Sequence, residues 1–321
     1  MKRIILALII ILTTSCNNKQ TTTHIPSEKV QNEESTDTNQ QEEYINMPPT
    51  FTIGDLTYEV IDSNHVALKR CNTSVSEIDI PTVVIHDGTE YKISYIECGA
   101  FYECNKLKSI IIPHGYTCIK NNTFYNCSNL SMITIPQSVT HIGEGAFRYC
   151  VNLTSINIPD NIQYIDNYAF ANCTNLTSIN IPNNVRLIGS GVFNECEKLT
   201  SVSIPSKVKL IKSVTFRKCK NLTTIIIPDN IEIIGKIAFS DCENLNSVTI
   251  GTNVHYIKST AFYGCTNLTT IICLAKEPPT LEIEVFPYPN NTTLLVPKGS
   301  LEKYKESDWN KYFNGRIKEM E

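Results

Sequence analysis

The chain has 321 residues, of which 41% are hydrophobic, and its 28 basic and 32 acidic residues give a formal net charge of -4. This length and hydrophobic content allow a large buried core. The slightly negative charge argues against a protein that attracts nucleic acid electrostatically.

Residues 1–16 have the features of an export signal. Lys2 and Arg3 form a charged start, and residues 4–12 form an apolar segment that is too short to span a bilayer. The string LTTSC resembles a bacterial lipobox, in which the cysteine, here Cys16, is lipidated and becomes the mature N-terminus. We therefore expect an exported lipoprotein on the outer membrane or cell surface of a bacterium, attached to the membrane by its lipid anchor alone. The alternative is an ordinary signal peptide with a chance cysteine.

Residues 17–50 are rich in Asn, Gln, Thr, Ser and Glu and contain few large apolar residues. Such a segment cannot offset the entropy cost of ordering, so we expect a disordered polar tether. A flexible chain of this length has a reach of about 30 Å. This reach would hold a folded domain clear of the lipid headgroups.

Residues 51–100 are predicted to form an N-terminal β cap and a first, atypical repeat. The segment VVIHDGTEYKISYI contains the pair Asp87 and Gly88, which favours a hairpin turn. With the preceding segment FTIGDLTYEVIDSNHVALK, this hairpin should close the open edge of the first coil.

Residues 101–273 repeat with a strict period of 23 residues. Each repeat has a phenylalanine, a cysteine three positions later and a leucine three positions after that. The eight phenylalanines are Phe101, Phe124, Phe147, Phe170, Phe193, Phe216, Phe239 and Phe262. This period predicts a leucine-rich repeat solenoid of about nine to ten stacked coils, with a parallel β-sheet on its concave face.

The repeat at residues 175–196, NLTSINIPNNVRLIGSGVFNEC, shows how one coil is built. Leu176, Ile179 and Ile181 alternate as the inward side of a short strand, and Pro182 ends that strand. The asparagine before the leucine, here Asn175, suits the turn because asparagine tolerates left-handed geometry. A single coil has too little apolar surface to fold alone, so neighbouring coils must stack.

The pattern L-x-x-I-x-I-P-x-x-V-x-x-I-G-x-x-A-F-x-x-C resembles the BspA-like, treponemal-type leucine-rich repeat. Residues 153–173 match it at nearly every position, and the resemblance extends from about Phe51 to the C-terminus. Members of this family are typically surface-exposed or secreted proteins of host-associated microbes that are implicated in adhesion. The resemblance implies a binding function without naming a ligand.

Residues 274–321 are predicted to form a C-terminal cap with a last strand and a short helix from about Ser300 to Phe313. The one tryptophan, Trp309, should cover the end of the core together with neighbouring aromatic residues.

The eight cysteines of the repeat should be small buried residues with free thiols. Cysteines stacked on adjacent coils have parallel side chains, so their Cβ atoms stay about 4.8 Å apart, further than a disulfide requires. Cys71, Cys98 and Cys118 lie outside this column, and a single disulfide among them stays open.

The sequence contains no recognisable catalytic, nucleotide-binding or zinc-protease motif, and its six histidines occupy unrelated repeat positions. We therefore expect neither an enzyme nor a cofactor or metal site.

The outward strand positions predict a small, hydroxyl-rich, uncharged face. Its central members are the candidate ligand-binding residues Ser155, Asn157, Ser178, Asn180, Ser201, Ser203 and Thr224. The alternative is that these residues merely make a soluble strand surface. A second column, with Tyr164, Leu187 and Leu210 at its centre, is either an exposed apolar stripe or turned inward.

Two functions remain open. The first is a cell-surface protein that binds a protein ligand, such as a host matrix or cell-surface protein, through the solenoid face. The second is a glycan-binding accessory lipoprotein in nutrient capture, which would need aromatic and carboxylate side chains clustered at one end. Tyr91, Tyr95, Tyr102 and Tyr125 are the candidates for that cluster. The sequence does not indicate the oligomeric state.

Overall fold

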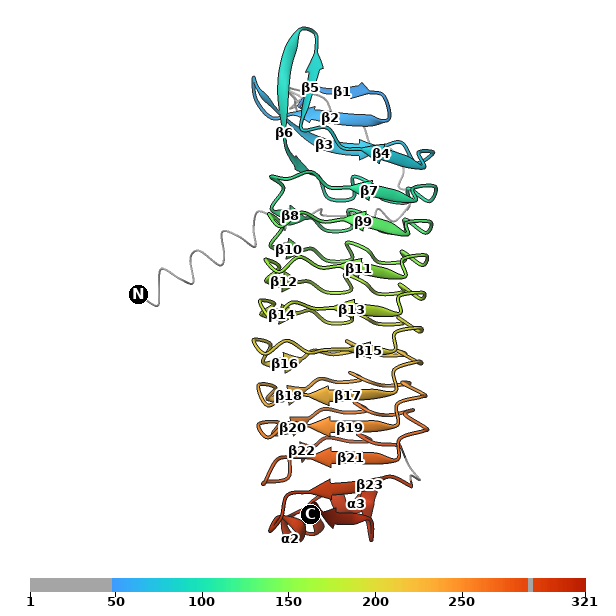
Figure 1. The fold of residues 1–321 in the computed structure, drawn as a ribbon, viewed down its shortest axis with the longest axis vertical. Helices are drawn as coiled ribbons and strands as arrows, with labels where there is room; N and C mark the ends of the chain where they lie inside the picture. Colours follow the sequence, from blue (N-terminus) through green and yellow to red (C-terminus); the bar gives the residue numbers. More distant parts are fainter. Residues whose placement is uncertain (1–47, 288–290) are drawn as a thin grey trace, which may run out of the picture.

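The computed structural model describes residues 48–287 and 291–321, which form an elongated stack of coils with a cap at each end (Figure 1). The predicted signal segment, including Cys16, and residues 17–47 of the predicted tether lie outside the described residues. No helix of the described part is both long and apolar enough to cross a membrane.

The first strand of each coil pairs in parallel with the first strand of the next coil, and together these strands form what we call the main sheet (Figure 1). The main sheet has three adjoining segments. Its strands are β4 (Glu77–Asp79), β7 (Ser109–Ile111), β9 (Met132–Thr134), β11 (Ser155–Asn157), β13 (Ser178–Asn180), β15 (Ser201–Val202), β17 (Thr224–Ile227), β19 (Ser247–Ile250), β21 (Thr270–Cys273), β23 (Thr293–Val296) and β24 (Ile317–Glu319). These eleven strands confirm the predicted solenoid, which is slightly longer than expected.

A second strand of only two residues follows in most coils and builds what we call the second sheet. Its strands are β8 (Cys118–Ile119), β10 (His141–Ile142), β12 (Tyr164–Ile165), β14 (Leu187–Ile188), β16 (Leu210–Ile211), β18 (Ile233–Ile234), β20 (Tyr256–Ile257) and β22 (Thr280–Leu281). All of its strand pairs are parallel and keep the same register, so equivalent residues lie beside one another. The turns that carry the repeat phenylalanine and cysteine complete each coil.

The repeat phenylalanines form a continuous column through the core. All eight are buried, and the ring centroids of neighbours lie 5.1 to 5.9 Å apart. The column continues to Phe286 and Trp309. Phe286 follows Phe262 by 24 residues, so the strict period did not reveal it. Trp309 is buried as predicted, and its indole N–H donates to the Pro279 carbonyl at 2.8 Å.

The repeat cysteines are buried beside the rings, as predicted, but they also act as hydrogen-bond donors. Each thiol from Cys127 to Cys265 donates to the carbonyl of the phenylalanine 26 residues earlier, with distances of 3.0 to 3.3 Å. Each of these bonds joins two coils. No disulfide links the twelve described cysteines, including the three outside the column.

Two positions in each coil have left-handed backbone geometry, two residues before and two residues after the phenylalanine. At Asn126, for example, φ is 54°, and its N–H donates to the Arg148 carbonyl of the next coil at 2.8 Å. The asparagine before the leucine is not left-handed, so that expectation was wrong. Its side chain instead bonds along the stack, as Asn152 does to Asn129 at 3.1 Å.

The N-terminal cap is a mixed five-stranded sheet (Figure 1). Its strands are β1 (Thr50–Ile53), β2 (Leu56–Val60), β3 (His65–Cys71), β5 (Val83–His86) and β6 (Thr89–Ile96). Strands β5 and β6 form the predicted hairpin, in which His86 pairs with Thr89 across the turn.

The C-terminal cap has two short helices, α2 (Leu301–Lys305) and α3 (Trp309–Phe313), where one helix was predicted. The side chains of Tyr304, Trp309 and Phe313 are buried and close the end of the core. Strand β24 was not predicted and pairs in parallel with β23.

The buried thiols predict an alkaline limit to stability. Burial raises the pKa of seven column thiols, to about 12 for Cys173 and Cys242. Above the ordinary thiol pKa of 9.0, the unfolded chain loses protons that the folded chain retains. Stability should therefore fall as pH rises through and above that value, by up to about 1.4 kcal/mol per thiol and pH unit.

Urea unfolding between pH 7 and 10.5 measures this loss. The double variant Cys173→Ala and Cys196→Ala removes two titrating thiols and should be less stable than the parent at pH 7, but should lose stability less steeply with pH. Equal slopes for parent and variant would contradict the assignment of the loss to these thiols.

Candidate functional site

The main sheet places the predicted candidate residues on one face of the stack. All seven, from Ser155 to Thr224, have exposed side chains. Ser155 pairs with Ser178, and Ser178 pairs with Ser201, so their side chains form a row across three coils. Asn157 and Asn180 form a parallel row beside it. The sequence had placed these residues on one face, and the structure brings them into direct register.

The polar groups of this face are available to a partner. No hydrogen bond between described residues uses the side chains of the seven candidates. The threonines at the edge of the sheet differ, because Thr177 and Thr200 donate their hydroxyls to carbonyls of the preceding coil at 3.1 Å. The candidate residues therefore present hydroxyl and amide groups to solvent.

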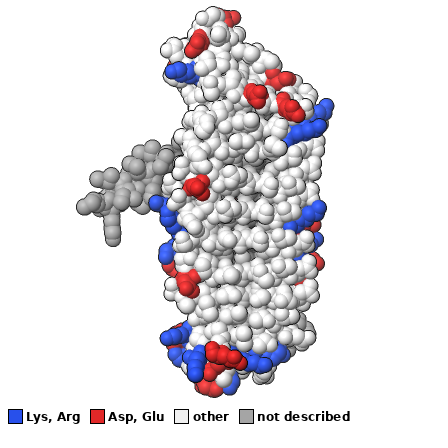
Figure 2. Space-filling model, viewed as in Figure 1, with Lys and Arg blue, Asp and Glu red and all other residues white. Residues whose placement is uncertain are grey.

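Charged side chains are absent from the outward positions of β7 to β21. In the face drawn in Figure 2, Lys, Arg, Asp and Glu gather along the long edges and at the two ends, and other residues fill the centre. Three exposed apolar side chains interrupt the hydroxyl-rich surface: Ile111, Met132 and Ile226 are 58%, 66% and 69% exposed. The face thus combines hydrogen-bonding groups with isolated apolar anchors.

The second sheet gives an intermediate result for the apolar column. Tyr164 and Leu187 are half-buried, and Leu210 is 40% exposed. Polar pairs interrupt this column. His141 Nε2 lies 2.7 Å from an oxygen of the Asp166 carboxylate. The column is therefore neither a continuous exposed stripe nor fully turned inward.

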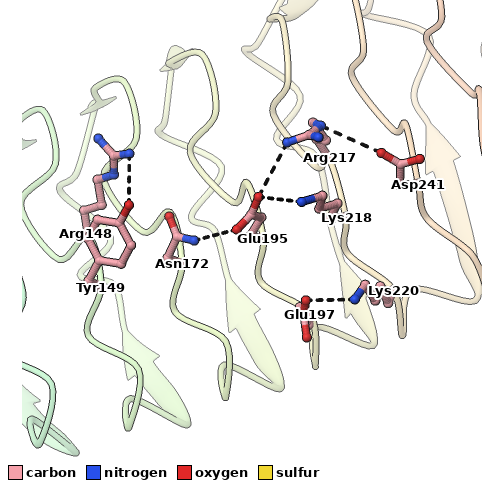
Figure 3. A network of polar contacts seen from close by, with 9 residues as sticks. All are labelled: Arg148, Tyr149, Asn172, Glu195, Glu197, Arg217, Lys218, Lys220 and Asp241. Atoms are coloured by element: carbon pink, nitrogen blue, oxygen red, sulfur yellow. Dashed lines mark hydrogen bonds and ion pairs between the residues drawn. The ribbon is translucent and has the colours of Figure 1, made fainter.

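The turn side of the stack carries a network of charges (Figure 3). The Glu195 carboxylate accepts hydrogen bonds from Lys218 at 3.0 Å and from Asn172 at 2.8 Å, and Arg217 lies 3.5 Å away. The bond from Lys218 is the main cause that lowers the pKa of Glu195. Arg217 also reaches Asp241, at 3.8 Å. These side chains satisfy one another across four coils, so this surface is held internally.

A cleft of about 610 Å³ lies between the N-terminal cap and the first coil. Its lining residues come from β1, β2, β3, the segment after β6 and the first turn: Thr50, Thr57, Glu59, Lys69, Arg70, Thr73, Glu97, Cys98, Gly99, Tyr102 and Glu103. Carboxylates and an aromatic ring thus cluster at one end of the solenoid.

The four tyrosines singled out in the sequence have different environments. Tyr102 lines the cleft and stacks on Tyr125, with ring centroids 4.8 Å apart. Tyr95 has the Lys120 amine over its ring at 3.7 Å, and Tyr91 packs near Phe51. Reasoning from sequence missed the charged residues of the cleft, because they come from separate strands of an atypical region without a repeat pattern.

Within the described residues, no group of three or more histidine, cysteine or acidic side chains is placed to hold a metal ion. The described histidines form no column, in line with their unrelated repeat positions. The candidate sites are therefore surfaces and clefts that offer hydrogen bonds, apolar contacts and ring stacking.

Comparison with known proteins agrees with this architecture. The model of the BspA type leucine-rich repeat region matches residues 70–200 and 186–306. The crystal structure of a Treponema pallidum leucine-rich repeat protein is similar, with 26% identity over 67% of this chain and 88% of that chain and a TM-score of 0.51. A leucine-rich repeat protein from Bacteroides ovatus shares the fold, with 22% identity over 84% of this chain and all of that chain and a TM-score of 0.51. No curated protein matches the chain. Because the family model covers most of its length, the chain belongs to the BspA type leucine-rich repeat family.

Proposed function

We propose that this protein is an exported, lipid-anchored recognition protein that binds a protein partner through the main-sheet face. The family suggests a role in protein interaction. The observation that carries the proposal is the row of exposed hydroxyl and amide side chains, from Ser155 to Thr224, that no described residue engages. A host matrix protein or a protein on a neighbouring cell is the partner that we favour.

The lack of charge makes this face suitable for burial. Covering a charged side chain in an interface costs free energy unless a partner compensates it, whereas a serine or asparagine needs only a hydrogen bond. Exposed apolar side chains such as Ile111 and Met132 can supply the hydrophobic contacts that anchor an interface. The face thus offers both kinds of contact at a low desolvation cost.

The regular spacing also limits how a partner binds. Adjacent strands are about 4.8 Å apart, so identical groups recur along the stack at this interval. A flat or extended partner would make similar contacts with several coils. Each contact would be weak, and the affinity would be the sum over the coils.

The proposed position at the cell surface depends on the predicted anchor at Cys16 and the polar segment that follows it. Residues 17–50 would separate the solenoid from the membrane, leaving the main-sheet face accessible to large partners.

The proposal predicts that charge on the main-sheet face weakens binding. A variant with lysine at Ser178, Asn180, Ser201 and Ser203 should bind its partner at least about tenfold more weakly, because four uncompensated charges would enter the interface. Binding is measured by surface plasmon resonance against a partner first identified by capture from serum and matrix proteins. The unfolding midpoint should change little, because all four side chains are exposed.

The matched control carries four lysines outside the main sheet, at Gln137, Asn183, Asn194 and Ser206, and should bind like the parent. Glu195 is avoided because it belongs to the charge network. Unchanged affinity in the main-sheet variant, with a loss in a triple alanine variant at Tyr164, Leu187 and Leu210, would move the site to the second sheet.

The anchor gives a separate prediction. If Cys16 is lipidated, the protein should partition into the detergent phase of Triton X-114, since each buried methylene of an acyl chain contributes about 0.8 kcal/mol. The Cys16→Ala variant should lose this behaviour. Mature parent protein that mass spectrometry shows to lack acyl chains would contradict the lipid anchor.

A further inference from the structure

We propose that the cleft at the N-terminal end binds a neutral saccharide chain, with one sugar ring stacked on Tyr102. This site is distinct from the main-sheet face and adds a second ligand class to the proposed protein-binding function. The inference rests on the position of Tyr102, the charge balance of the cleft and the shape of the hollow.

Tyr102 is placed as a stacking platform. Its ring is 45% exposed and lies parallel to the ring of Tyr125, with an angle of 3° between the two planes. Tyr125 covers one face of Tyr102, and among the described residues no other ring covers the opposite face. The ring is therefore held in place before a ligand arrives. A pyranose ring presents C–H groups on one face and would cover this surface without displacing a side chain.

The charges of the cleft favour a neutral ligand. The Glu59 carboxylate is paired with Lys69. The Glu97 carboxylate lies 3.4 Å from the Lys120 amine and also accepts from the backbone N–H of Cys98 at 3.2 Å. A strongly charged ligand would have to disrupt these pairs or remain uncompensated.

Two further side chains remain available for hydrogen bonds. Arg70 and Glu103 are exposed, line the cleft and have no side-chain ion pair within the described residues. A guanidinium donates and a carboxylate accepts, so the pair can serve both roles of sugar hydroxyl groups. Their charges are opposite, which keeps the cleft close to neutral.

The hollow is long enough for more than one sugar. Its volume of about 610 Å³ falls within the roughly 300–1,000 Å³ that is usual for small-molecule sites. A second hollow of about 290 Å³ adjoins it and shares three lining residues, Thr57, Arg70 and Thr73. Asp55 and Asn72 add polar groups there. A chain of sugars can thus extend from Tyr102 past Arg70.

The test uses the full-length protein in detergent and an array of neutral plant, microbial and mucin oligosaccharides, followed by calorimetry with the oligosaccharides that it retains. We expect binding of at least one neutral oligosaccharide, at least a tenfold loss of affinity in Tyr102→Ala and near-parental affinity in Tyr102→Phe, which keeps the ring. Affinity should vary less than twofold between 50 and 500 mM NaCl because the ligand carries no charge.

Tyr263→Ala is the matched control. Tyr263 occupies the same repeat position as Tyr102, directly after the phenylalanine, and is 51% exposed, but it lies far along the stack. It should leave saccharide binding unchanged, as should the main-sheet lysine variant. This separates the two sites, since loss of protein binding in the latter leaves the cleft intact.

Three outcomes would overturn the proposal. The first is that no neutral oligosaccharide on the array binds. The second is that binding survives Tyr102→Ala in protein whose unfolding midpoint matches the parent. The third is that Tyr102→Ala abolishes binding to the protein partner while no saccharide binds, which would make the cleft part of the protein interface.

Discussion

The stacking of phenylalanine rings along the core is the interaction on which the rest of this structure depends. Neighbouring rings lie 5.1 to 5.9 Å apart, close to the spacing of about 4.8 Å between hydrogen-bonded strands. Because the two distances nearly match, the rings and both sheets can stack in the same register. The thiol of each repeat cysteine then meets the phenylalanine carbonyl of the preceding coil. Apolar packing and hydrogen bonding therefore fix the same alignment of coils.

This alignment also determines the surfaces. Each outward residue lies beside its counterpart in the next coil, so a short polar motif becomes a row, as in Ser155, Ser178 and Ser201. On the turn side, the same register brings acidic and basic residues of different coils together in the charge network around Glu195. One surface thus satisfies its polar groups internally, while the main-sheet face leaves them for a partner.

The ends of the stack interrupt the register, and they differ from each other. At the C-terminal end, Tyr304, Trp309 and Phe313 cover the last coil with aromatic side chains. At the N-terminal end, a mixed sheet meets the first coil and leaves the cleft beside Tyr102. A repeated surface suits large partners that contact many coils, whereas a single cleft suits a small ligand. The chain thus offers two binding modes on separate surfaces.

The sequence by itself determined the solenoid, the inward residues and the face that carries the candidate residues, because a strict period of 23 residues forces equivalent side chains into columns. It also predicted the Asp87–Gly88 hairpin and the burial of Trp309, since both follow from local turn chemistry or from apolar composition. Only the tertiary structure revealed the thiol donors, the left-handed positions beside each phenylalanine and the ninth ring at Phe286. These features depend on contacts between residues on neighbouring coils or follow a one-residue slip in the period. The N-terminal cleft likewise joins Glu59, Arg70 and Tyr102, which are far apart in the chain and share no repeat position. Their proximity arises from the packing of the cap on the first coil, which no periodic pattern encodes.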